Sequence, residues 1–125
     1  MKTVIRTEHF LNTAKACGMS EEQQLAIVDS IAANPDMGIM ISGTGGCRKC
    51  RFAGRGKGKS GGYRTIHYNG SDDVPVVMLI AISKGARENI GKGERNELKV
   101  LMQTYEQDYR AGVLANVAKR QGGAA

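Results

Sequence analysis

The sequence predicts a single small domain with helices at both ends of the chain and strands between them. The chain has 125 residues, of which 41% are hydrophobic and 24% charged, enough for one core. Residues 37–71 contain no Asp or Glu and hold ten of the seventeen glycines, whereas both flanks have mixed charges and helix-like spacing. We therefore expect helices, then a basic glycine-rich middle, then an apolar strand, then a final helix.

The N-terminal part is predicted to form a short strand and two helices. Residues 2–6 can form the strand, and residues 8–17 suit a helix that Gly18 ends. A Ser-x-x-Gln capping box at residue 20 opens the second helix, which Asn34-Pro35 ends near residue 33. The predicted buried residues of this helix are Leu25, Val28, Ile31 and Ala32.

The middle of the chain is predicted to form three strands. Residues 47–53 and 63–69 form two of them, joined by a glycine-rich loop at 54–62. Residues 69–73 (NGSDD) form a turn. Residues 75–83 are apolar at both parities, so we expect a central strand that is covered on both faces.

The last predicted helix begins after Gly91 and has a regular apolar stripe. This stripe consists of Leu98, Leu101, Met102, Tyr105 and Tyr109. Residues 121–125 are expected to be a flexible tail, and residues 1–120 a single domain.

Positive charge is concentrated in the acid-free middle of the chain. The formal net charge is +6, which favours a polyanionic partner such as nucleic acid, the ribosome or an acidic protein. Seven of the eighteen basic residues lie there: Arg48, Lys49, Arg51, Arg55, Lys57, Lys59 and Arg64. The alternative is a solvated basic loop that only keeps the protein soluble.

Strand parity predicts which of these cations share a face. Lys49 and Arg51 should project together, while Arg48 projects with the expected core residue Phe52. Arg64 enters the paired strand just after the loop. These side chains, with Lys57 and Lys59 on the loop, predict a concave cationic surface on which glycine amides can approach phosphates.

Several other functions are excluded by local pattern. Gly58-Lys59-Ser60 resembles the end of a P-loop, but Ala53 replaces its first glycine and a strand follows, so we reject ATP or GTP binding. The longest apolar run, residues 74–82, is too short to span a membrane. No secretory segment is recognised at the N-terminus, and three cysteines favour a reducing cytoplasm.

The cysteines and histidines give no convincing reactive site. Cys47 and Cys50 have zinc-ligand spacing, but in a strand they point to opposite faces, so we expect buried structural thiols. His67 lacks a recognisable acid or nucleophile partner and is more readily interpreted as structural. We predict neither a metal nor a cofactor.

The glycine-rich and basic motifs together resemble a known family. Residues 43–51 (GTGGCRKCR) and 56–64 (GKGKSGGYR) look like the HigB branch of the RelE/ParE toxin superfamily. The segments 76–84 and 94–98 are similar to the same family. The resemblance covers roughly residues 1–110. It implies a compact α+β fold, in which N-terminal helices and a C-terminal helix pack on a twisted, mainly antiparallel sheet.

The resemblance also implies a function. It implies the toxin of a type II toxin–antitoxin system, a ribosome-dependent endoribonuclease that cleaves mRNA in the A site by metal-independent 2′-oxygen attack. The implied partner is a HigA-like helix-turn-helix antitoxin. The implied catalytic residues are Arg64, Lys49, Arg51 and Lys84. The remaining middle cations, Arg48, Arg55, Lys57 and Lys59, are then expected to bind RNA.

One departure from the family pattern keeps alternatives open. Just beyond the 75–83 strand, where toxins with the best-defined acid/base scheme carry a Tyr or Arg, this chain has no Tyr and offers Arg87. One alternative is a non-catalytic toxin relative that binds RNA or the ribosome. A less favoured one is a ParE-like inhibitor of DNA gyrase.

Overall fold

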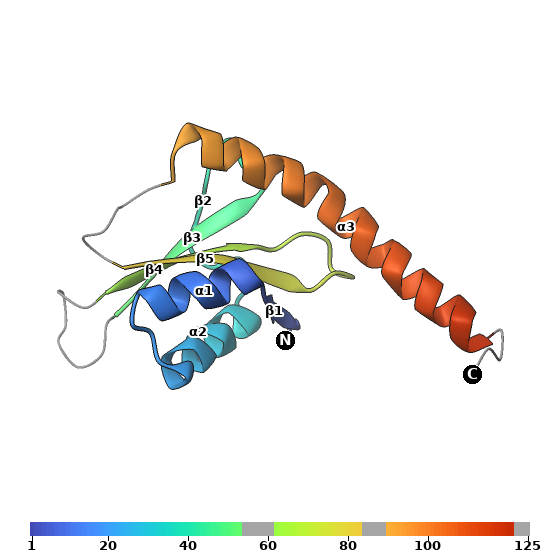
Figure 1. Ribbon diagram of the computed structural model, residues 1–125, viewed down its shortest axis with the longest axis horizontal. Helices are drawn as coiled ribbons and strands as arrows, with labels where there is room; N and C mark the ends of the chain where they lie inside the picture. Colours follow the sequence, from blue (N-terminus) through green and yellow to red (C-terminus); the bar gives the residue numbers. More distant parts are fainter. Residues whose placement is uncertain (54–61, 84–89, 122–125) are drawn as a thin grey trace.

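The described residues form an α+β fold with helices on both faces of one sheet (Figure 1). The computed structural model describes residues 1–53, 62–83 and 90–121, the last nine of them as backbone only. The elements are β1 (Val4–Arg6), α1 (Glu8–Ala16), α2 (Glu21–Ala33), β2 (Ile39–Met40), β3 (Cys47–Phe52), β4 (Tyr63–Tyr68), β5 (Val76–Ser83) and α3 (Lys92–Gln121).

The sheet is mainly antiparallel, as predicted. Its strand order is β1-β5-β4-β3-β2, and only β1 and β5 run parallel among the described strands. The parallel pair joins the start of the chain to its middle, with Val4 opposite Val76. A bulge between Ile66 and His67 shifts the pairing of β4 with β5.

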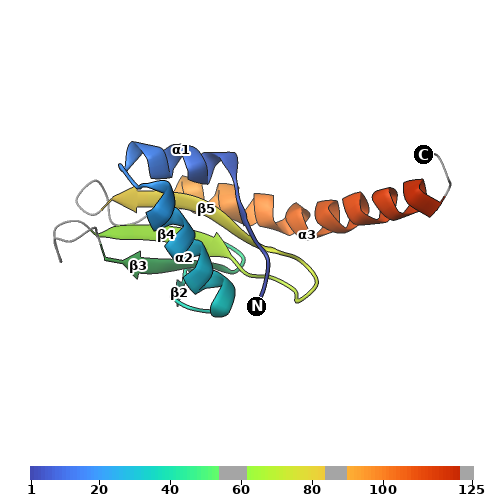
Figure 2. The same cartoon turned by 90° about the horizontal axis from the view of Figure 1, so that it is seen from below.

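Two hydrophobic cores lie on opposite faces of the sheet. The helices α1 and α2 cover one face, where Phe10 and Ile31 pack with Met78 of β5. The other face is covered by α3, whose Leu98 and Met102 pack with sheet residues. In Figure 2, α2 lies in front of the sheet and α3 behind it. The apolar strand β5 contributes to both cores, which confirms the prediction that it is covered on both sides.

The predicted helix boundaries are confirmed by the caps. The Ser20 hydroxyl accepts from the Gln23 backbone, and the Gln23 side chain accepts from the Ser20 backbone, which completes the capping box. At the end of α1, Gly18 has φ +75°, a left-handed conformation that favours glycine.

Two predicted core residues are exposed. In α2, Leu25 is 46% exposed. The helix buries Gln24, Ile27 and Ile31 instead. Gln24 can occupy a buried position since its amide oxygen accepts a hydrogen bond from Arg6, with a nitrogen–oxygen distance of 3.0 Å. In α3, Leu101 is 52% exposed, at the edge of the stripe formed by Leu98 and Met102.

The helix α3 is held along its first half and then leaves the sheet. The Tyr105 hydroxyl donates to the carbonyl of Pro75 at 2.8 Å. The Glu106 carboxylate accepts from the Tyr68 hydroxyl at 2.7 Å and from the Ser71 hydroxyl at 2.6 Å. Farther along, α3 extends past the sheet as a projecting rod (Figure 1). None of the described helices combines the length and apolar composition that crossing a bilayer requires.

The short strand β2 is absent from the sequence-based prediction. It pairs only Ile39 with Lys49 and Met40 with Arg48, and both of its side chains are exposed. Two apolar residues are too few to show the alternation by which a strand is recognised in a sequence. Its place at the edge of the sheet nevertheless matters, since it forms one wall of the candidate site.

Candidate functional site

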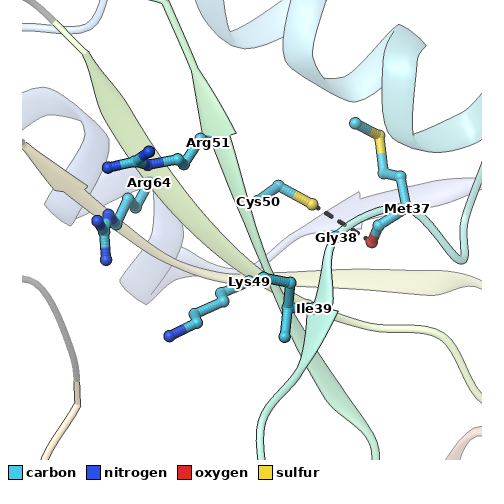
Figure 3. A pocket seen from close by; sticks show the side chains of 7 residues that line it. All are labelled: Met37, Gly38, Ile39, Lys49, Cys50, Arg51 and Arg64. Carbon is cyan, nitrogen blue, oxygen red and sulfur yellow. Dashed lines mark hydrogen bonds between the residues drawn. The ribbon is translucent and has the colours of Figure 1, made fainter.

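A hollow of about 540 Å³ opens over the β2 edge of the sheet. Three cations line it: Lys49 and Arg51 from β3 and Arg64 from β4. The remaining lining residues are Met37, Gly38, Ile39 and Cys50. In Figure 3 the three cationic side chains extend to one side of the strands, whereas Met37 and the Cys50 thiol lie to the other.

The strand register brings the three cations together. Arg51 lies directly opposite Arg64, and Lys49 lies opposite Ile66, so Lys49 and Arg64 are diagonal neighbours. This agrees with the parity prediction that Lys49 and Arg51 share a face. Like charges placed directly opposite each other destabilise a sheet. An anion bound between these cations would relieve that repulsion.

Gly38 allows the wall of the hollow to approach the sheet. Its φ is +91°, and a Cβ at this position would collide with the Lys49 carbonyl oxygen and come within 2.6 Å of the Cys50 sulfur. Only glycine fits this combination of backbone angle and close approach. The segment around Gly38 therefore lies directly against β3.

Arg48 projects to the other face, where it anchors this same segment. Its guanidinium donates to the carbonyl of Asp36 at 2.9 Å and more weakly to that of Gly38 at 3.4 Å. Arg48 is not among the residues that line the hollow. The structure thus separates Arg48 from Lys49, Arg51 and Arg64, and its assignment to RNA binding stays a prediction.

The two central cysteines lie in opposite cores. Cys47 packs on the α3 side and Cys50 on the α1–α2 side, as their spacing in a strand predicts. Burial raises the pKa of each thiol to about 11. Both are therefore protonated near neutral pH, and neither is a reactive nucleophile.

His67 is fully buried and its tautomer is fixed by its partners. Its Nε2 lies 2.8 Å from the carbonyl oxygen of Pro35, which can only accept, so Nε2 carries the proton. Its Nδ1 is then the acceptor facing the Cys50 sulfur at 3.8 Å. Burial lowers the pKa of His67. These contacts support the structural interpretation of this residue.

Several predicted site residues lie outside the described part of the chain. These are Lys84, the loop cations Arg55, Lys57 and Lys59, and Arg87. The described part of the predicted catalytic set is therefore Lys49, Arg51 and Arg64.

A further cation, which the sequence reasoning missed, lies beside this set. Arg95 in the first turns of α3 shares a small recess with Lys49 and Arg64. Two sequence signals pointed to it: Arg95 lies in the segment 94–98 that resembles the family, and a cation near a helix N-terminus is opposed by the helix dipole.

Comparison with known families gives this geometry a context. A family model described as "RelE toxin of RelE / RelB toxin-antitoxin system" matches residues 2–121, nearly the whole chain.

The chain belongs to the RelE toxin family.

This membership agrees with the superfamily that the sequence resembles and with its α+β fold. It supports a toxin role and implies an antitoxin partner. The hollow with its three cations is accordingly the candidate site of a RelE-family toxin.

Proposed function

We propose that this RelE-family chain is the toxin of a type II system and cleaves mRNA in the ribosomal A site. The observation that carries the proposal is the convergence of Lys49, Arg51 and Arg64 on one hollow. RelE-family toxins are generally endoribonucleases, and the glycine-rich central motif favours the HigB branch. A HigA-like helix-turn-helix antitoxin that covers the cationic hollow is the proposed partner, and the cytoplasm the proposed compartment.

The proposed reaction needs positive charge more than a strong nucleophile. The ribose 2′-oxygen forms a bond to the adjacent phosphorus, and the bond from phosphorus to the 5′-oxygen breaks. A proton leaves the 2′-hydroxyl and another reaches the 5′-oxygen, giving a 2′,3′-cyclic phosphate and a 5′-hydroxyl. Charge builds up on the phosphorane oxygens, where fixed cations stabilise the transition state. No metal ion is required in this proposal.

The described cations suit different parts of this task. The guanidinium groups of Arg51 and Arg64 can each give two parallel hydrogen bonds to phosphate oxygens. Lys49 supplies a compact charge beside them. By resemblance, Arg64 is the residue we propose for the scissile phosphate, with Lys84 as a further catalytic residue. Arg48, Arg55, Lys57 and Lys59 are proposed to hold the flanking RNA.

The decisive experiment expresses the chain in a bacterial host and maps mRNA ends by primer extension. We expect the wild type to produce cuts only in translated regions. Arg64→Ala should lose roughly 100-fold or more of this cutting, because a main charge-stabilising group is removed. Lys15→Ala, which removes an exposed cation on α1 that does not line the hollow, is the matched control and should cut normally.

Other outcomes would change the assignment. Growth arrest with intact mRNA would favour the non-catalytic or gyrase-directed alternatives. Unchanged cutting by Arg64→Ala would remove Arg64 from the site. If the wild type produced neither growth arrest nor cuts, the proposed toxin activity would be wrong.

A further inference from the structure

A second, much smaller cavity lies behind the hollow, between the sheet and the start of α3. Its volume is about 30 Å³, room for a single water-sized group such as one phosphate oxygen. Lys49 and Arg64 line both cavities, and Arg95 lines only the inner one. The rest of its wall is apolar and consists of Ile41, Ile66, Ile82 and Ile90. This inner cavity is called the recess below.

The side chain of Arg95 has a hydrogen-bond donor that lacks an acceptor among the described residues. Its Nε is buried and has no hydrogen-bond acceptor among the described residues. Leaving a buried N–H unpaired costs free energy, and in native proteins such a group calls for an explanation. Its backbone amide, by contrast, makes the ordinary helical bond to the Gly91 carbonyl at 3.0 Å.

The position of Arg95 adds a second cost. It is the fourth residue of α3, where the positive end of the helix dipole disfavours a cation. The neighbouring Glu94 carries the negative charge that this end of the helix favours. Its carboxylate accepts a hydrogen bond from the Gly91 backbone amide at 3.1 Å. A residue that is costly for both hydrogen bonding and charge is better explained by a ligand than by folding.

We propose that Arg95 is a phosphate-binding residue of the site, whose Nε–H donates to a phosphate oxygen seated in the recess beside Lys49 and Arg64. This inference rests on the proposed function and extends it. Four isoleucines line the rest of the recess, so the local dielectric constant is lower and charge attraction is stronger there than at the open surface. An oxygen held there is in contact with cations from β3, β4 and α3. Growing negative charge on that oxygen would be stabilised from three directions.

The first test observes the donor directly. In the folded chain, the Nε–H resonance of Arg95 is identified in a nitrogen–proton NMR spectrum by its disappearance in Arg95→Lys. Inorganic phosphate is the probe, titrated against sodium chloride at equal ionic strength. We expect a saturable shift with phosphate and none with chloride. A resonance that phosphate leaves unmoved overturns the proposal.

The second test separates ligand binding from a structural role. Arg95→Met should keep or raise the urea midpoint of unfolding, because an unpaired buried donor is removed. It should also weaken phosphate binding and slow mRNA cutting by at least about tenfold, because the variant cannot make a charge-assisted hydrogen bond to the transition state. Lys99→Met, one turn along α3 and exposed, removes the same charge and should behave as wild type.

The outcomes distinguish this inference from the function on which it rests. If the wild type leaves mRNA intact, the proposed nuclease function fails, and the phosphate titration still decides the role of Arg95. If the wild type cuts and Arg95→Met cuts equally fast, the inference about Arg95 is overturned while the nuclease function stands. A large loss of stability in Arg95→Met would show a structural residue and would also overturn it.

Discussion

At the scale of single residues, His67 shows how an ionisable group is kept neutral inside the fold. It donates to Pro35 and faces the Cys50 thiol. Burial is the main cause of its lowered pKa; the Pro35 carbonyl and Asp36 act in the opposite direction, and Arg48 adds to the lowering. Protonation would place a charge in the α1–α2 core. In the unfolded chain the imidazole is exposed to water and can be protonated without that cost.

This neutrality predicts a pH dependence of stability. Near and below the ordinary histidine pKa of 6.5, the unfolded chain binds more protons at this residue than the folded chain does, because the pKa of His67 is lowered in the fold. The free energy of unfolding should therefore fall as pH drops from 7 toward 5, by up to about 1.4 kcal/mol per pH unit. Urea unfolding followed by circular dichroism measures this, with His67→Gln as the variant that should lose the slope.

The carboxylates do not obscure this window. Glu21, Asp73 and Glu106 all have a lowered pKa in the fold, so the stability that they contribute is lost only below their ordinary values of 4.5, 3.8 and 4.5. A stability that stays flat between pH 5 and 7, or an unchanged slope in His67→Gln, would contradict the prediction.

Residue-level prediction from sequence succeeded where the period of a strand decides the outcome. Alternation alone placed Lys49 and Arg51 together and separated Cys47 from Cys50. It could not find Arg95, because the recess forms only when α3 packs across β3 and β4. The fit of Gly38 against Lys49 likewise depends on packing between distant segments.

At the scale of the elements, α3 depends on a narrow apolar stripe. Leu98 is 8% exposed and packs in the core, whereas Leu101, three residues on, is 52% exposed. The two leucines have the same chemistry on the same helix. They therefore form a matched pair for measuring how much the packing of α3 on the sheet contributes to the free energy of unfolding.

We expect Leu98→Ala to lower the free energy of unfolding by roughly 2–5 kcal/mol, because a cavity opens beneath α3. Leu101→Ala should cost less than about 1 kcal/mol, since most of its side chain already contacts water. Urea unfolding of both variants measures the difference. Equal losses would mean that the stripe is wrongly assigned and that Leu101 packs as its position in the sequence predicts.

Elements with a strong period or a cap were predictable, and the others were not. The capping box of α2 and the glycine at the end of α1 marked their helices in advance. The burial of Gln24 in place of Leu25 was not predictable, because it depends on a hydrogen bond from Arg6 in β1. Two-residue β2 was missed since its pairing with β3 is not encoded in its own composition.

At the scale of the whole molecule, the excess of positive charge should govern RNA affinity. The formal net charge is +6, and Lys49, Arg51 and Arg64 face one hollow. Binding of single-stranded RNA should weaken as salt rises, because each phosphate contact releases counterions. Arg51→Gln should reduce the logarithmic salt slope by roughly 0.7, the value for one contact on a single strand.

Fluorescence anisotropy of a labelled single-stranded RNA at several salt concentrations measures this slope. Lys15→Gln removes the same charge from the exposed end of α1 and should leave the slope unchanged. An equal reduction in both variants would indicate attraction by net charge alone. The hollow would then have no special part in binding RNA.

The parallel pairing of β1 with β5 also determines when the protein can first fold during its own synthesis. Among the described strands β1 pairs only with β5, so it has no partner strand until residues 76–78 have been made, and Arg95 follows later still. Contacts so distant in sequence form slowly. The early part of the nascent chain, with its strand and two helices, lacks the sheet against which they pack. Until Arg95 has been made, the nascent chain therefore lacks part of the wall of the recess and cannot contain the assembled candidate site.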